Sequence, residues 1–185
     1  MAEERAANDL ELLAVDAATL FVLTDSGRIL RTNSPGDLAA PRLYLARCAS
    51  GSVVRIRHDV GEGTARAIER LAASEPALRD PHGTPVHLAE YVQILGAEAP
   101  VENVNAGLIW TFPDRLDYEH PATLVSSDRP KSDRLLARLV EQGMPEAPAL
   151  RGRALFYSAS RTNVSSHRVA RRLGLRLIGT SLGIT

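Results

Sequence analysis

A single cysteine, few aromatic residues and no excess of charge of either sign exclude several classes of protein. Cys48 is the only cysteine, so an intramolecular disulfide and a cysteine-rich zinc site are both excluded. The 22 basic and 22 acidic side chains balance, so no overall field attracts nucleic acid or an anionic membrane. Aromatic residues make up 4% of the sequence, too few for a surface that stacks single-stranded bases. We therefore expect no nucleic-acid partner.

Long apolar runs are also missing. The most apolar early stretch, residues 12–23, contains Asp16 and is too short to span a bilayer. The N-terminus is acidic, whereas an export signal begins with basic residues. Together with the lone cysteine, these absences predict a cytoplasmic protein with no membrane partner.

The hydrophobic content is sufficient for a buried core. Hydrophobic residues make up 44% of the 185 residues, enough for one ordinary domain or two small ones. In residues 1–100 the patterns predict helices over 1–18, 64–73 and 85–95, and strands over 19–24, 28–32, 42–48 and 53–58. We therefore expect an N-terminal α+β region in which helices pack on antiparallel hairpins.

Residues 101–185 form the second predicted region. Here the patterns predict strands over 104–112, 122–125, 154–159 and 175–184, with helices over 129–141 and 163–173. Trp110 and Phe112 lie on the first of these strands and are expected in a core or an interface. The expected fold class is α/β (α+β), a mixed sheet flanked by helices.

The segment after Asn163 contains the most specific pattern. Asn163 is in position to cap a helix, and Gly174 stands where a left-handed C-terminal cap favours glycine. The helical period places an apolar or small set on one face, comprising Ser166, Val169, Ala170 and Leu173. It places a basic set on the other face, comprising His167, Arg168, Arg171 and Arg172.

This segment resembles the last strand–helix–strand motif of the Gcn5-related N-acetyltransferases, the GNAT superfamily. The matching positions are Asn163, Ser166, Val169, Arg172, Gly174 and Leu175, and Ala170 stands where the family has a tyrosine. The stretch from Ala122 onward is similar to the first strand and helix of that fold. The early turn at Asp25 to Arg28, with Asn33, is similar to the N-terminal region of longer bacterial GNAT proteins.

The resemblance implies that the protein binds acetyl-CoA and transfers its acetyl group to an amine on a small molecule or a peptide. It assigns cofactor binding to Asn163, Ser166 and Arg168. An asparagine amide can both donate to and accept from the amide-rich arm of the cofactor, and arginine suits a phosphate.

Two parts of the family pattern are missing from this sequence. The glycine-rich loop whose backbone amides hold the cofactor pyrophosphate has no counterpart between Glu141 and Leu155. The tyrosine that donates a proton to the leaving thiolate is replaced by Ala170. One substitute loop, residues 57–64, follows a strand and places Gly61 and Gly63 before a helix that Thr64 would cap.

Three hypotheses remain open from the sequence. The chain is an active or weakly active acetyltransferase whose phosphate loop comes from residues 61–64 or from a partner chain. Alternatively, it is a non-catalytic module that uses an open sheet edge to form a homodimer or bind a protein. In the third, it is an internally deleted chain that folds poorly.

The five histidines show no metal-ligand spacing and suggest no serine–histidine–acid set, so structural roles are expected for them.

Overall fold

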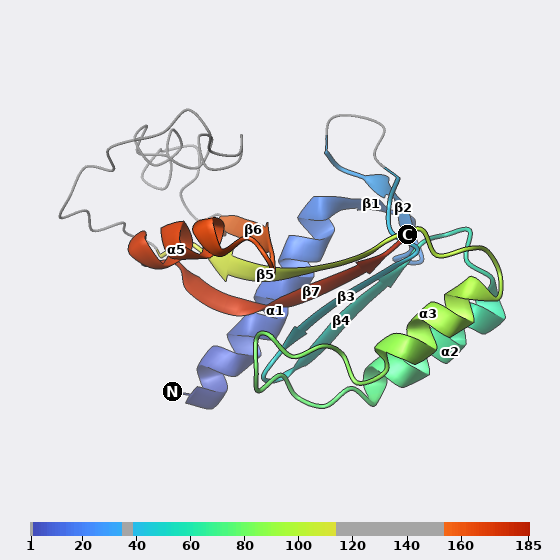
Figure 1. Ribbon diagram of the computed structural model, residues 1–185, viewed down its shortest axis with the longest axis horizontal. Coiled ribbons are helices and arrows are strands. Elements are labelled where there is room, and N and C mark those ends of the chain that lie inside the picture. The colour runs from blue at the N-terminus through green and yellow to red at the C-terminus, as the bar shows by residue number, and fades with distance from the viewer. Residues whose placement is uncertain (1, 35–38, 114–153) are drawn as a thin grey trace. The chain divides into compact units, whose positions relative to one another are not determined.

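The computed structural model describes residues 2–34, 39–113 and 154–185 (Figure 1). The helices there are α1 (Ala2–Leu20), α2 (Glu62–Ala73), α3 (Leu88–Gly96) and α5 (Val164–Arg172). The strands are β1 (Phe21–Leu23), β2 (Ile29–Thr32), β3 (Leu43–Cys48), β4 (Gly51–Ile56), β5 (Val104–Thr111), β6 (Phe156–Ser160) and β7 (Arg176–Ile184). The α+β class is confirmed. The strand and helix predicted over 122–125 and 129–141 lie outside the described residues.

The strands form two sheets. The hairpin β1–β2 is a two-stranded sheet, and the second sheet has the order β4-β3-β7-β5-β6. Strand β3 pairs antiparallel with both β4 and β7, so Leu45 lies opposite Val54 on one side and Leu182 on the other. The chain divides into two compact units, one of Met1–Leu108 with Ile178–Thr185 and one of Ile109–Leu177.

In the first unit, helices cover both faces of the sheet. Successive side chains of a strand point to opposite faces. Leu43 and Leu45 of β3 belong to the core beneath α2 and α3, whereas Tyr44 between them contacts Asp16 of α1. The core on the α2–α3 side also includes Ile68, Tyr91, Leu95 and Ile184, each with no exposed surface.

Helix α1 approaches the sheet closely, and a glycine makes this approach possible. A Cβ atom at Gly179 would lie 2.5 Å from the carbonyl oxygen of Arg47 and 3.1 Å from a methyl group of Leu13. Both neighbours are inside the protein, since Leu13 is fully buried and Arg47 is 4% exposed. Glycine therefore lets α1 pack directly on this part of β7.

A carboxyl group is buried beneath α1. Asp16 is 2% exposed, and its Oδ2 accepts a hydrogen bond of 3.1 Å from the hydroxyl of Tyr44. Burial raises the pKa of Asp16 to about 6, against the opposing effect of the Tyr44 hydrogen bond. Burial and the neighbouring Asp16 raise the pKa of Tyr44 above its ordinary value. Protonated Asp16 is thus the form that this environment favours.

Arg42 fixes the end of α3. Its guanidinium donates to the carbonyl oxygens of Leu95, Ala99 and Pro100 at 3.0, 3.0 and 2.9 Å. The last carbonyl groups of a helix lack partners within the helix, and a cation there also complements the helix dipole. This contact ties α3 and the chain after it to the start of β3.

A second buried arginine holds the connection between α2 and α3. Arg47 forms an ion pair of 3.2 Å with Glu75, and their side chains are 5% and 1% exposed. The Glu75 carboxylate also accepts from the backbone amides of Val86 and His87, each at 3.0 Å, and from the Tyr91 hydroxyl at 3.2 Å. The buried Glu75 carboxylate thus accepts hydrogen bonds from four donors, which offset the cost of burying its charge.

The helix boundaries correct one prediction. Helix α2 begins at Glu62 with Gly61 as its N-cap, so Thr64 lies inside the helix and does not cap it.

Trp110 is 4% exposed, which confirms its expected place in a core. In the described part of the chain, no helix has the length and apolar character needed to cross a bilayer.

Candidate functional site

The predicted C-terminal strand–helix–strand is present. Strand β6 leads through Asn163 into α5, whose C-cap is Leu173. Gly174 follows with a φ of +67°, the left-handed conformation that the sequence predicts at this position. The basic residues Arg171 and Arg172 occupy the last turn, where they complement the helix dipole.

Asn163 acts as the N-cap of α5. Its side-chain oxygen accepts a hydrogen bond of 3.1 Å from the backbone amide of Ser166 and one of 2.8 Å from the Ser165 hydroxyl. The first turn of a helix has backbone amides without helical acceptors, and an asparagine oxygen satisfies one of them. The acceptor that the resemblance assigns to the cofactor arm is therefore used by the helix itself.

The two other predicted cofactor residues lie in different environments. Ser166 is 1% exposed and faces the interior, whereas Arg168 is exposed. Of the three residues, Arg168 alone projects a long side chain into solvent. This arrangement does not fit a cofactor held jointly by Asn163, Ser166 and Arg168.

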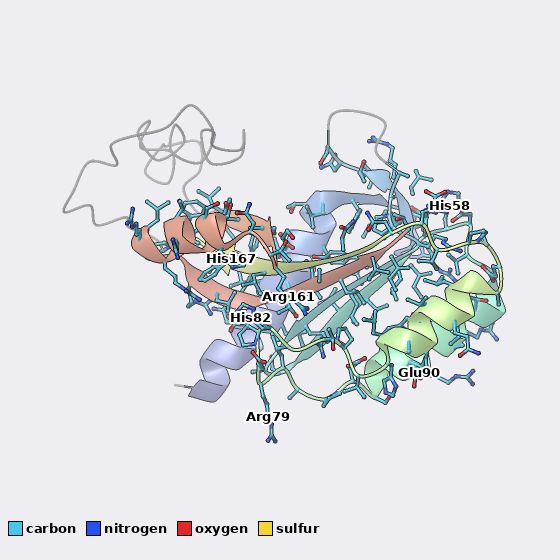
Figure 2. The ribbon with its side chains drawn as sticks, in the orientation of Figure 1. His58, Arg79, His82, Glu90, Arg161 and His167 are labelled. Atoms are coloured by element: carbon cyan, nitrogen blue, oxygen red, sulfur yellow. The ribbon has the colours of Figure 1, made fainter. Side chains whose placement is uncertain are left out.

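The prediction for His167 is wrong. The helical pattern placed it with the exposed basic face, but it is 4% exposed. Its Nε2 lies 3.0 Å from the carbonyl oxygen of Ser160, and its ring centre lies 6.4 Å from that of Trp110. His167 follows Ser166 at the border of the buried face, and its Nε2 reaches Ser160 at the end of β6; Figure 2 labels His167 beside α5. The exposed basic face thus comprises Arg168, Arg171 and Arg172.

Ala170 is fully buried at the position where the family has its proton-donating tyrosine. A methyl group carries no transferable proton, so this position supplies no general acid. The helix therefore contributes packing at the point where the resemblance would require chemistry.

The substitute loop before α2 has acidic neighbours. The amide of Gly61 donates to Glu98 Oε2 at 3.4 Å, and a Cβ atom at Gly61 would lie 2.5 Å from Glu98 Oε1. Glu62 opens the helix and pairs with Arg28 at 2.7 Å and Arg66 at 3.2 Å. A carboxylate already lies where a phosphate would approach the helix start, and it would repel that phosphate. Gly61 and its neighbours do not fit a pyrophosphate.

The structure brings together three residues that the sequence analysis did not connect. Ser74 Oγ lies 3.1 Å from His87 Nε2, and His87 Nδ1 lies 3.6 Å from Glu90 Oε1. The signal in the sequence was the spacing of His87 and Glu90 by three residues on a helix, but Ser74 is separated from them by a loop. Among the described residues, no group of three potential ligands is placed to hold a metal ion.

No protein-family model, no curated protein and no solved structure matches this chain.

Proposed function

We propose that this protein derives from the GNAT superfamily and that its C-terminal motif no longer transfers acetyl groups, serving instead as a binding module. The observation that carries the proposal is the use of Asn163. Its oxygen caps α5 by bonding Ser166 and Ser165, so the most specific residue of the resemblance has a structural role that needs no cofactor.

Two further observations support the loss of catalysis. Ala170 offers no acid, and Glu98 stands in front of Gly61 at the start of α2. Backbone amides at a helix start bind phosphate when they are free and the local charge is positive. Here the Gly61 amide already donates to Glu98, and Glu62 places a second carboxylate at the helix start.

Calorimetric titration of the full chain with acetyl-CoA tests the proposal. We expect no heat of binding up to 100-fold molar excess of the ligand. Glu98→Gln is the matched variant, because it removes the carboxylate beside Gly61 without changing the side-chain volume. A micromolar site in the wild-type protein, or acetylation of an amine by it, contradicts the proposal.

Strand β6 indicates how such a module binds. The amide of Phe112 and the hydroxyl of Thr111 donate to the carbonyl oxygen of Leu155 at 3.1 and 3.2 Å. The end of β5 therefore meets the start of β6, and the two strands run antiparallel. Backbone groups of alternate residues point to the same side of a strand, so those of Leu155, Tyr157 and Ala159 face β5.

It follows that Phe156 and Ser158 direct their backbone groups away from β5. In the described part of the chain, β6 is the outer strand of its sheet. An outer strand with free amides and carbonyls can pair with the same strand of a second copy about a two-fold axis. Homodimerisation through β6 is the second candidate function.

Light scattering at micromolar concentration tests the dimer. We expect a particle of twice the 20.0 kDa chain mass. Ser158→Pro removes an outward amide and should give a monomer with unchanged far-ultraviolet circular dichroism. Ala159→Pro is the contrasting variant, because it removes an inward amide and should destabilise the fold. A clean 20.0 kDa particle for the wild-type protein rejects this candidate.

A further inference from the structure

The end of α2 and the start of α3 hold a serine, a histidine and a carboxylate in sequence. Ser74 Oγ is 3.1 Å from His87 Nε2, and His87 Nδ1 is 3.6 Å from Glu90 Oε1. Ser74 is exposed, while the side chains of His87 and Glu90 are 23% and 50% exposed. Nε2 thus lies at hydrogen-bond distance from a hydroxyl, while Nδ1 lies within ion-pair range of a carboxylate without a hydrogen bond to it. A hydroxyl, an imidazole and a carboxylate in this order can activate a serine nucleophile.

A groove leads to this set. It has a volume of about 560 Å³ and runs between α2 and α3, lined by Ala67, Arg70, Leu71, Glu90, Gln93, Ile94 and Ala97. On α2, Ser74 follows Arg70 and Leu71 by four and three residues, so it continues the same stripe of the helix. On α3, Glu90 lines the groove itself (Figure 2). Through Glu90, the reactive groups therefore adjoin an open surface groove with a largely apolar lining.

The buried Arg47–Glu75 pair holds the set in place. Glu75 follows Ser74 directly in the chain and accepts the backbone amide of His87 at 3.0 Å. The same carboxylate binds Arg47 and Tyr91. The backbone on both sides of the Ser74–His87 contact is therefore attached to one buried ion pair, which keeps the hydroxyl and the imidazole together.

We propose that Ser74 and His87 form a catalytic pair, positioned by Glu90, that hydrolyses carboxylic esters with a short apolar acyl group. The Ser74 hydroxyl donates to the Leu71 carbonyl at 2.7 Å. Rotation about the Cβ–Oγ bond turns its hydrogen toward His87 Nε2. Hydrogen bonds of catalytic groups often become aligned only when substrate is bound.

The chemistry proceeds in two steps. Ser74 Oγ attacks the ester carbonyl carbon while its proton passes to His87 Nε2; the bond to the alcohol oxygen then breaks, and the alcohol leaves with that proton. In the second step, water attacks the acyl-serine and gives a proton to His87 Nε2. The bond to Ser74 Oγ breaks, and the proton returns to Ser74. The products are a carboxylic acid and an alcohol, and water is the only co-reactant.

The groove determines the class of substrate. Leu71, Ile94 and the two alanines offer an apolar wall to an acyl chain, and a volume of this size accepts a small ligand. Glu90 and Arg70 both line the groove, so their charges offset each other and the lining does not select a charged acyl group. Uncharged aliphatic esters are therefore the expected substrates.

Rapid mixing of the full chain with p-nitrophenyl butyrate tests the proposal. We expect a burst of p-nitrophenolate equal to one per chain, followed by slower turnover. Ser74→Ala should abolish the burst, and His87→Gln should slow acylation by about 100-fold or more. Glu90→Gln should lower kcat at unchanged KM, and Glu90→Asp should recover part of that loss.

Controls separate this site from general catalysis by surface groups. His58→Gln and Ser26→Ala remove an exposed histidine and an exposed serine elsewhere and should leave the burst intact. Because Ser74 also bonds the end of α2, mass spectrometry of the wild-type protein after reaction provides a second measurement. A butyryl group on the peptide that contains Ser74 supports the proposal. No burst, or an adduct on another residue only, overturns it.

Discussion

The start of α5 and the junction of α2 with α3 contain similar residues in opposite situations. At α5, Asn163 caps the helix, Ser166 is 1% exposed and His167 is 4% exposed. At the α2–α3 junction, Ser74 is exposed and the His87 side chain is 23% exposed. In the motif that resembles a known family the serine and the histidine lie buried, whereas Ser74 and His87, which the sequence analysis did not connect, lie nearer the surface. Residue type alone therefore does not locate chemistry; the exposure and the partners of each polar side chain do.

The position of each histidine relative to its helix explains the contrast. His167 lies within α5 beside the buried Ser166, so its ring is drawn between the helix and β6 and meets the Ser160 carbonyl. His87 is the N-cap residue of α3, so its carbonyl accepts the first helical hydrogen bond, from Tyr91, while its side chain makes no capping hydrogen bond. Its ring is consequently free to extend toward the end of α2.

The largest expected effect comes from breaking the support of the junction. Glu75→Gln leaves the buried Arg47 without its counter-charge, so the free energy of unfolding should fall by about 3–5 kcal/mol in urea titrations. The burst with p-nitrophenyl butyrate should be lost as well, because one of the two oxygens that accept from Arg47, Val86, His87 and Tyr91 becomes an NH2 group that cannot accept a hydrogen bond. This variant therefore disrupts the α2–α3 junction and leaves the start of α5 unchanged.

Glu62→Gln is the matched control for that change. Glu62 is also paired with arginines, but its side chain is 66% exposed. Exposed ion pairs contribute at most about 1 kcal/mol, so this variant should keep most of the stability and the whole burst. Equal losses in the two variants contradict the role assigned to the buried pair.

A second effect distinguishes the two buried carboxylates of the first unit. Glu75 has four hydrogen-bond donors, whereas Tyr44 is the donor to Asp16. The pKa of Asp16 is raised from 3.8 to about 6, so its neutral form is favoured in the folded state. Its contribution to stability is full below pH 3.8 and is lost as the pH rises through 6.

Asp16→Asn should therefore gain stability relative to the wild-type protein as the pH rises. Each pKa unit corresponds to about 1.4 kcal/mol, so the difference between the two proteins should change by about 2–3 kcal/mol from pH 4 to pH 8. Asn keeps an acceptor for Tyr44, and the other titrating groups are shared by both proteins. A difference that is constant across this range refutes the account of Asp16.

Much of the fold was predictable because its signals are local. The Asp25–Gly27 turn, the alternation in β3 and β4 and the glycine at position 174 each reflect a steric or hydrophobic rule that acts within a few residues. The start of α2 was displaced by two residues because Gly61 took the cap that Thr64 was expected to provide. Boundaries of this kind depend on neighbours such as Glu98.

The chemistry was less predictable because it depends on long-range contacts. The contact between Ser74 and His87 depends on backbone that the distant Arg47–Glu75 pair holds in place, and no local pattern connects these residues. In the same way, the inward turn of His167 depends on the carbonyl of Ser160 and on Trp110. A helical wheel could not distinguish this border position from the exposed face.

The central claim is that Asn163 serves as the N-cap of α5. The free energy of unfolding of two variants, measured in urea, tests this claim most directly. Asparagine and aspartate are equally good caps, whereas replacing a cap by alanine costs about 1 kcal/mol. We therefore expect Asn163→Asp to match the wild-type protein and Asn163→Ala to lose about 1 kcal/mol, with the exposed Arg171→Ala within about 0.5 kcal/mol as the control. Unchanged stability in Asn163→Ala, together with acetyl-CoA binding that this variant abolishes, would contradict the account.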